Sequence, residues 1–200
     1  MLRSFIKKVI IFLRQQYPPR GHFLKIVPKE SIGIELGVFK GEFAVQLLRV
    51  TQPKELHLVD LWWVGFGEYY PDWGEYTQFG KLKTKDAYQQ AVDLVDKNDT
   101  DGVAKVHVGD DLKYLSTFED GHFDWAYIDS SHAYEHTLKE LMLLKDKVNP
   151  NGIIMGHDWR PDPDSRHHGV YQAINEFCSE QGWKLIKTDF HTQWAIRRNS

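Results

Sequence analysis

Apolar and polar positions alternate along the chain in blocks that favour strands and helices in turn. Short apolar runs of β type predict strands at 31–36, 55–61, 104–108, 123–129 and 152–156. Between them, apolar positions recur at helical spacing over 42–50 and 134–147, and another helix is predicted near Ala87. Strands that alternate with helices form a parallel sheet with crossover helices, so the pattern predicts a doubly wound α/β domain.

The two ends of the chain depart from this alternation. Strand-like runs at 184–189 and 193–197, joined by a brief turn, predict an antiparallel hairpin that closes a Rossmann-like, mostly parallel seven-stranded sheet. Residues 5–13 place apolar side chains on one side of a helix and basic ones on the other, and Pro18 and Pro19 break it. We therefore expect an amphipathic helix with a connector at 1–30 and a single domain at 31–200.

Length and charge narrow the class of protein. A chain of 200 residues with 42% hydrophobic and 26% charged residues is typical of one folded domain. The net charge of -3 argues against a nucleic-acid partner, which usually requires a basic excess, and favours a small-molecule ligand. The apolar run at 9–13 is too short for a signal peptide or a membrane span. We expect a cytoplasmic protein without an integral membrane segment, whose first helix could support a homodimer, and we interpret the single cysteine, Cys178, as a packing residue.

A glycine turn follows the first predicted strand. Glu35, Gly37 and Gly41 stand in a Glu-x-Gly-x-x-x-Gly arrangement, in which Gly37 permits a tight turn and Gly41 lets a ligand approach the start of the next helix. Asp60 ends the second strand, where a carboxylate can accept hydrogen bonds from both hydroxyls of a ribose. These residues predict a ligand site at the carboxyl edge of the sheet.

A second polar group follows the fourth and fifth predicted strands. Asp129 and His132 come after one strand, and His157 and Asp158 come after the other. Because parallel strands end at the same edge of a sheet, these side chains should converge. Carboxylates together with imidazoles make a plausible site for a divalent cation. The structural alternatives are that the two acids cap the helices that follow and that His132 bonds a backbone carbonyl.

The glycine turn and the acid after it resemble the first motifs of class I S-adenosylmethionine-dependent methyltransferases. The resemblance implies that Glu35, Gly37 and Gly41 surround the methionine portion of S-adenosylmethionine, and that Asp60 binds its ribose. Further cofactor contacts are implied for Leu61, Gly109, Asp110, Asp111 and Asp129. Leu61 would lie against the adenine, and either Asp110 or Asp111, with Asp110 favoured, would accept a hydrogen bond from the adenine amino group.

The second polar group is similar to the metal-assisted branch of small-molecule and sugar O-methyltransferases. In that branch an acid after the fourth strand and a polar pair after the fifth hold magnesium, while a basic residue three positions beyond the first acid removes the substrate proton. The resemblance implies Asp129, His157 and Asp158 as metal ligands, with His132 and Asp129 as catalytic residues. His157 departs from the pattern, because magnesium rarely accepts nitrogen. Three alternatives stay open. The site holds Mg, Mn, iron or zinc with His157 as a ligand, His157 lies outside the ligand shell, or the site holds no metal.

We therefore expect an S-adenosylmethionine-dependent O-methyltransferase whose acceptor is a small molecule with a hydroxyl group, of sugar or phenol type. The aromatic segment 62–79 is expected to contact the acceptor, with a satellite core as the alternative. Competing hypotheses are a non-catalytic S-adenosylmethionine-binding module and a nicotinamide-dependent oxidoreductase, although the Gly-x-Gly-x-x-Gly turn of the latter is missing.

No metal-binding role is predicted for the remaining histidines. His167 and His168 follow Pro161 and Pro163, which indicates a flexible lid rather than a second metal cluster. The others show no spacing typical of metal ligands: His22, His57, His107, His122, His136 and His191.

Overall fold

Residues 20–199, which the computed structural model describes, form a seven-stranded sheet of order β3-β2-β1-β4-β5-β7-β6. The strands are β1 (Ile32–Leu36), β2 (Glu55–Asp60), β3 (Ala104–Val108), β4 (Phe123–Ile128), β5 (Val148–Gly156), β6 (Trp183–Thr188) and β7 (Trp194–Arg198). Strands β1 to β5 pair in parallel, and β7 runs antiparallel to both β5 and β6. The predicted doubly wound sheet with its antiparallel C-terminal hairpin is confirmed.

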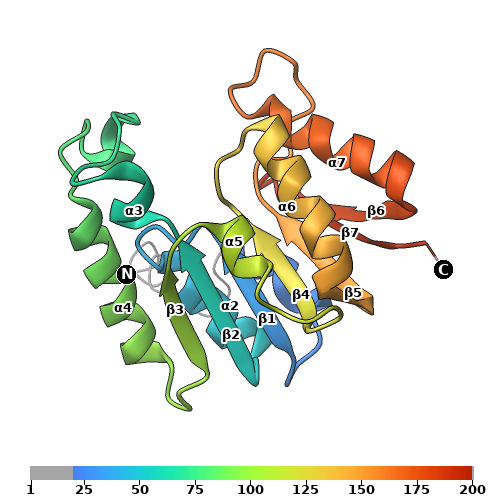
Figure 1. Cartoon of the computed structure of the whole chain (residues 1–200), viewed down its shortest axis with the longest axis horizontal. Coiled ribbons are helices and arrows are strands. Elements are labelled where there is room, and N and C mark those ends of the chain that lie inside the picture. The colour runs from blue at the N-terminus through green and yellow to red at the C-terminus, as the bar shows by residue number, and fades with distance from the viewer. Residues whose placement is uncertain (1–19, 200) are drawn as a thin grey trace, which may run out of the picture.

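Helices cover both faces of this sheet (Figure 1). One face carries η1 (Phe23–Ile26), α2 (Glu42–Thr51) and α4 (Thr84–Asn98), and the other carries α5 (Asp111–Leu115), α6 (Tyr134–Lys147) and α7 (His168–Gln181). Side chains alternate between the two cores along each strand. In β4, Trp125 and Tyr127 join the core on the α2 side, whereas Ala126 and Ile128 join the core on the α6 side.

The register of the parallel strands decides which residues meet at the carboxyl edge. Leu36 of β1 pairs with Val59 of β2 on one side and with Ile128 of β4 on the other, and Ile128 pairs with Gly156 of β5. The residues that follow these positions therefore lie side by side: Gly37, Asp60, Asp129 and His157.

Strand β5 starts earlier than the sequence pattern indicates. It begins at Val148 rather than at 152, and Pro150 is one of the exposed residues near its start. The pairing with β4 shifts register between Phe123 and Trp125. A local irregularity of this kind lets a strand accommodate proline, which donates no ladder hydrogen bond.

The aromatic segment 62–79 is more ordered than its lack of periodicity indicates. It contains α3 (Trp62–Phe66) and η2 (Gly74–Thr77). Trp62 and Tyr70 are buried in the core on the α2 side, whereas Tyr76 is 58% exposed and Phe79 is 61% exposed. One half of the segment thus packs as a satellite core, and the other half leaves aromatic rings on the surface.

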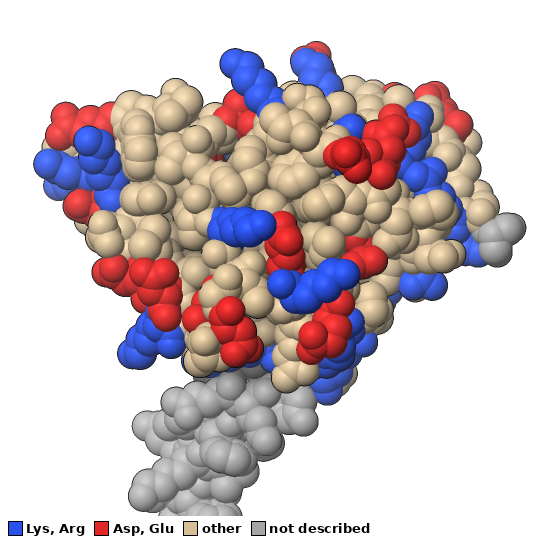
Figure 2. Space-filling view, turned by 60° about the horizontal axis from the view of Figure 1, so that its bottom comes forward, with Lys and Arg blue, Asp and Glu red and all other residues tan. Residues whose placement is uncertain are grey.

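The predicted amphipathic helix at 5–13 lies outside the described residues. Over residues 20–199, none of the helices combines the length with the apolar character that crossing a bilayer demands. On the face displayed in Figure 2, acidic and basic side chains are intermixed and no broad basic surface is seen.

Candidate functional site

The turn after β1 is held by the carboxylate that ends β2. Asp60 Oδ2 accepts hydrogen bonds from the backbone amides of Val38 at 2.9 Å and Phe39 at 2.7 Å, and Oδ1 accepts one from the amide of Trp62 at 3.2 Å. Burial raises the pKa of Asp60, and these backbone hydrogen bonds oppose the rise. Asp60 therefore shapes the glycine turn, a structural role beyond the ribose contact predicted for it.

The two glycines of the turn are required for different reasons. Gly37 has a φ of +91°, and a Cβ there would lie 2.2 Å from the carbonyl oxygen of Asp129, so only glycine lets the ends of β1 and β4 come this close. Gly41 has a φ of +79°, and its Cβ would lie 2.8 Å from the Cα of Ala91 on α4. Gly41 is therefore needed for the close packing of this turn against α4. Its approach to a ligand stays a prediction.

Glu35 is a buried acid beside this turn. Its side chain is on β1, the residue is 1% exposed, and its Oε2 atom has no hydrogen-bond partner among the described residues. Burial and the neighbouring charges of Asp129 and Asp60 raise its pKa well above the ordinary value, and Arg20 opposes this rise. An unpartnered buried carboxyl oxygen is costly, so the arrangement favours a polar ligand group at this place.

The structure brings the predicted acid and histidine group together. His132 Nε2 lies 3.2 Å from Asp129 Oδ1 and 3.0 Å from Asp158 Oδ2, so one imidazole joins the ends of β4 and β5. His157 Nδ1 lies 3.1 Å from Asp158 Oδ2 and 3.8 Å from Asp129 Oδ1. One ligand atom each from Asp129, His157 and Asp158 lies within 4.8 Å of the others, which is the set predicted to hold a metal.

The close contacts shift the protonation of this group. Burial alone would raise the pKa of Asp129 and Asp158, yet hydrogen bonds from His132 outweigh it and both values fall, with a further hydrogen bond from His157 acting on Asp158. Burial would lower the pKa of His132, but its hydrogen bonds to the two acids raise it to about 9. The two acids therefore favour the protonated form of His132, so its predicted role as a base requires that this effect be offset.

Arg20 is part of the site and was not predicted. It donates hydrogen bonds to Asp129 Oδ2 at 2.7 Å and to the Tyr127 hydroxyl at 2.9 Å, and its guanidinium lies 4.1 Å from the centre of the Phe43 ring. The contacts with Asp129 and Tyr127 join residues more than one hundred positions apart, and Arg20 stands in an aperiodic connector. No local pattern in the sequence could have identified it.

His167 also reaches the site. Its ring centre lies 4.5 Å from that of His132, and the ligand atoms of His132, Asp158 and His167 lie within 4.8 Å of one another. His168 is the first residue of α7, and its Nδ1 lies 2.9 Å from the carbonyl oxygen of Arg160. The proposed lid therefore includes the start of a helix, with His167 directed at the acid and histidine group.

The acids after β3 differ in their surroundings. Asp110 caps α5 by accepting a hydrogen bond from the amide of Lys113 at 2.9 Å. Asp111 is buried, and its two carboxylate oxygens lie 3.1 and 3.0 Å from His136 Nε2. Asp110 keeps one oxygen available for a ligand, whereas Asp111 is engaged with α6. This difference favours Asp110 for the predicted adenine contact.

Comparison with known proteins identifies the family of this chain. A family model described as a methyltransferase domain matches residues 34–159. This range contains the glycine turn, Asp60 and the whole acid and histidine group. No curated protein matches the chain in sequence.

Solved structures share the fold at low sequence identity. The O-methyltransferase TomG from Streptomyces achromogenes, involved in tomaymycin synthesis and solved with S-adenosylmethionine, is 14% identical with a TM-score of 0.59, over 90% of this chain and 78% of TomG. An S-adenosylmethionine-dependent methyltransferase from Aquifex aeolicus is 15% identical with a TM-score of 0.59, over 96% of this chain and 95% of its own. Spermidine synthase from Thermotoga maritima is 13% identical with a TM-score of 0.55, over 86% of this chain and 54% of the synthase. At these identities the likeness concerns the fold.

Proposed function

This chain belongs to the methyltransferase-domain family and has the fold of a class I S-adenosylmethionine-dependent methyltransferase, and from that premise we propose that it methylates a hydroxyl oxygen of a small molecule. The observation that carries the proposal is the convergence of Asp129, His132 and Asp158 beside the Gly37 turn. A proton acceptor and paired carboxylates next to the methyl-donor site suit the activation of a hydroxyl group.

The residues around the turn fit S-adenosylmethionine. The unpartnered Oε2 of Glu35 would meet the methionine portion, and Gly37 would let it pass close to the backbone. Asp60 would hold the ribose while it shapes the turn, and a Cβ at Gly109 would meet nothing within 4 Å, which leaves room for the adenine. Leu61 and Asp110 are proposed as the adenine contacts.

The chain's own residues would prepare the acceptor. When bound, S-adenosylmethionine supplies a methyl group on sulfur that is open to in-line attack by an oxygen nucleophile. Asp129 and Asp158 hold the His132 imidazole in place from two strands through its Nε2 atom. In neutral His132, Nε2–H donates to these acids, so the lone pair of Nδ1 is the proposed acceptor of the hydroxyl proton. His132 has a φ of +60°, a conformation that sets the direction of its side chain at some cost in backbone energy.

Asp129, His157 and Asp158 would hold a divalent cation, and their donor set fits one. Two carboxylates and one imidazole within 4.8 Å suit manganese better than magnesium, since magnesium prefers oxygen ligands. Such a cation lowers the pKa of a bound hydroxyl, and its charge disfavours the protonated form of His132.

The exposed aromatic rings support an acceptor of phenol or sugar type. Tyr76 of η2 stacks on Phe39 of the glycine turn with ring centres 4.2 Å apart, so the aromatic segment reaches the cofactor turn. Phe79 presents a second ring at the surface. Flat aromatic faces bind planar rings and the apolar faces of sugars.

Substitution of His132 tests the proposal. In His132→Ala we expect turnover to fall by about 100-fold or more, the usual contribution of a positioned general base, with unchanged affinity for S-adenosylmethionine. Turnover is followed as release of S-adenosylhomocysteine with a panel of catechols and hydroxylated sugars, and cofactor affinity by calorimetry. Ser131→Ala is the matched control, because Ser131 lies in the same loop and is exposed.

Two outcomes would count against the proposal. Unchanged turnover in His132→Ala would show that another group takes the proton. Binding of S-adenosylmethionine without turnover of any acceptor, in the presence of magnesium or manganese, would instead support a non-catalytic binding module. Repeating the calorimetry with each metal and with a chelator separates the need for a cation from the need for the cofactor.

A further inference from the structure

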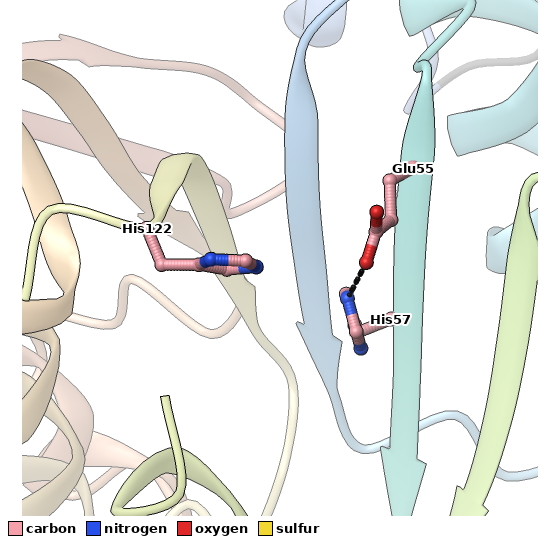
Figure 3. Close-up of side chains that lie close together, drawn as sticks. All are labelled: Glu55, His57 and His122. Atoms are coloured by element: carbon pink, nitrogen blue, oxygen red, sulfur yellow. Dashed lines mark hydrogen bonds and ion pairs between the residues drawn. The ribbon is translucent and has the colours of Figure 1, made fainter. Parts of the chain in front are cut away.

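A group of histidines lies far from the site at the carboxyl edge, around the start of β2. Glu55 and His57 are alternate residues of β2 and point to the same face, and His122 directly precedes β4. Figure 3 shows the His122 ring directed across β1 toward the Glu55 and His57 pair. One ligand atom from each of the three residues lies within 4.8 Å of the others. The topology thus gathers a carboxylate and two imidazoles that the sequence spacing did not reveal.

The contacts of these residues leave ligand capacity unused. His57 Nε2 lies 2.6 Å from Glu55 Oε1, and the same oxygen lies 2.7 Å from Lys105 Nζ. The Nε2 atom of His122 is buried and has no hydrogen-bond partner among residues 20–199. A buried ring nitrogen without a partner is unfavourable, and a metal ion is one group that would satisfy it.

The second ring nitrogen of His57, which does not face Glu55, has a hydrogen-bond partner of the kind found behind metal-binding histidines. This nitrogen, Nδ1, lies 3.0 Å from the Tyr114 hydroxyl, which lies 2.5 Å from His107 Nε2. Without a metal, His57 Nε2–H donates to Glu55 Oε1, because a carboxylate oxygen can only accept. In the metal-bound form the proton would lie on Nδ1 and be donated to Tyr114, the Tyr114 hydroxyl would donate to His107, and Nε2 would be free to bind the ion. Ligating histidines usually donate their second N–H in this way, which fixes the tautomer.

We propose that Glu55, His57 and His122 bind a divalent transition metal of the zinc class, with water in the fourth position. Imidazole ligands favour zinc, copper or nickel over magnesium or calcium. Ligand atoms on one zinc ion are about 3.3 Å apart, given bond lengths of about 2.0–2.1 Å. The ion would displace the ammonium of Lys105, which is half exposed and free to swing away.

Such an ion would fasten the segment before β4 to β2. His122 stands in the connection between α5 and β4, and Glu55 and His57 belong to a strand of the central sheet. Because the three ligands come from two separate parts of the fold, metal binding should stabilise the folded state and raise the unfolding temperature.

Cobalt titration of a full-length variant that lacks the other groups of candidate ligands tests this inference. In His136→Gln/His157→Ala/Asp158→Asn, free of any affinity tag, we expect one equivalent of Co²⁺ to give the visible absorption of a low-coordinate site, and Zn²⁺ to displace it. Adding His122→Ala should remove the absorption, whereas adding His191→Ala, a histidine outside every candidate cluster, should leave it unchanged.

Two further variants separate a metal site from hydrogen-bonded packing. Tyr114→Phe should weaken Co²⁺ binding by about 10–100-fold, the usual effect of removing the hydrogen-bond partner of a ligating histidine. Lys105→Met should tighten binding several-fold, because it removes the competing ammonium, and circular dichroism shows whether each variant is folded. The proposal is wrong if the parent variant binds no Co²⁺, if the folded His122→Ala variant keeps the absorption, or if Lys105→Met weakens binding.

Discussion

Glu35 is the residue in which folding and ligand binding conflict most plainly. Its buried carboxyl has an unpartnered oxygen and a raised pKa, caused first by burial and then by Asp129 and Asp60. A group that costs stability in the free protein and faces the proposed methionine portion is one that ligand binding would satisfy. The conflict therefore gives a direct test of the role assigned to Glu35.

In Glu35→Gln, we expect the affinity for S-adenosylmethionine to fall by about 10–100-fold, since a hydrogen bond to a charged group contributes about 1.5–3 kcal/mol. The unfolding temperature should stay the same or rise, because the amide avoids the cost of burying a carboxylate or of protonating it on folding. Calorimetry and thermal denaturation on the same preparation measure both quantities. Unchanged cofactor affinity would remove Glu35 from the binding site.

At the scale of elements, the approach of β1 to β4 is what builds the site. In Gly37→Ala we expect a loss of at least about 3 kcal/mol of unfolding free energy, because a left-handed φ costs about 1–2 kcal/mol and the new Cβ collides with the Asp129 carbonyl. Gly109→Ala is the matched variant, since its Cβ meets open space. It should stay within about 0.5 kcal/mol of wild type in urea denaturation. Equal losses in both variants would contradict the packing argument.

Helices α5 and α6 are joined by a titratable pair. The hydrogen bond to Asp111 raises the pKa of His136, while the pKa of Asp111 is lowered because hydrogen bonds from His136 and Glu140 outweigh the effect of burial. A raised histidine pKa stabilises the fold below its unfolded value of about 6.5, and this contribution disappears as the pH rises through the folded pKa. A lowered aspartate pKa stabilises the fold above the unfolded value of about 3.9, and this contribution is lost as the pH falls through the folded pKa.

The pair should therefore stabilise the protein most between about pH 4 and pH 6.5. We expect His136→Gln to lower the unfolding temperature by about 2–4 °C at pH 5.5, corresponding to about 1 kcal/mol, and by less at pH 8.5. Thermal denaturation of both proteins across this range gives the difference directly. A difference that is constant or grows with pH would show that His136 acts through packing alone.

At the scale of the whole molecule, the sequence predicted what depends on local pattern. The strands and the direction of their ends follow from apolar periodicity, and parallel pairing then places Asp129 and His157 together. Other features depend on distances between elements that are far apart in the chain, and local pattern does not reveal them. They are the contacts of Arg20, the packing of Gly41 against α4, and the position of His122 beside β2. The raised pKa of His132 depends on the same distances, because Asp129 and Asp158 reach it from different strands.

Arg20 links the start of the described chain to the far end of the sheet. It pairs with Asp129 after β4, and its carbonyl oxygen accepts a hydrogen bond from Gln193 Nε2, just before β7, at 3.2 Å. The Arg20 and Asp129 side chains are 25% and 19% exposed, so solvent weakens their attraction only in part. The connector before β1 is therefore expected to be part of the folded unit.

A double-mutant cycle with unfolding free energy as the readout measures this link without relying on activity. Arg20→Met should lower the unfolding temperature by about 2–8 °C, corresponding to about 1–2 kcal/mol, because Asp129 loses one of its cationic partners. In Asp129→Asn the same change should cost less, leaving a coupling energy of about 1 kcal/mol. Tyr127→Phe serves as a second partner variant, since the Tyr127 hydroxyl also accepts from Arg20. Additive effects throughout would mean that Arg20 contributes by covering Phe43 rather than by pairing with the acid.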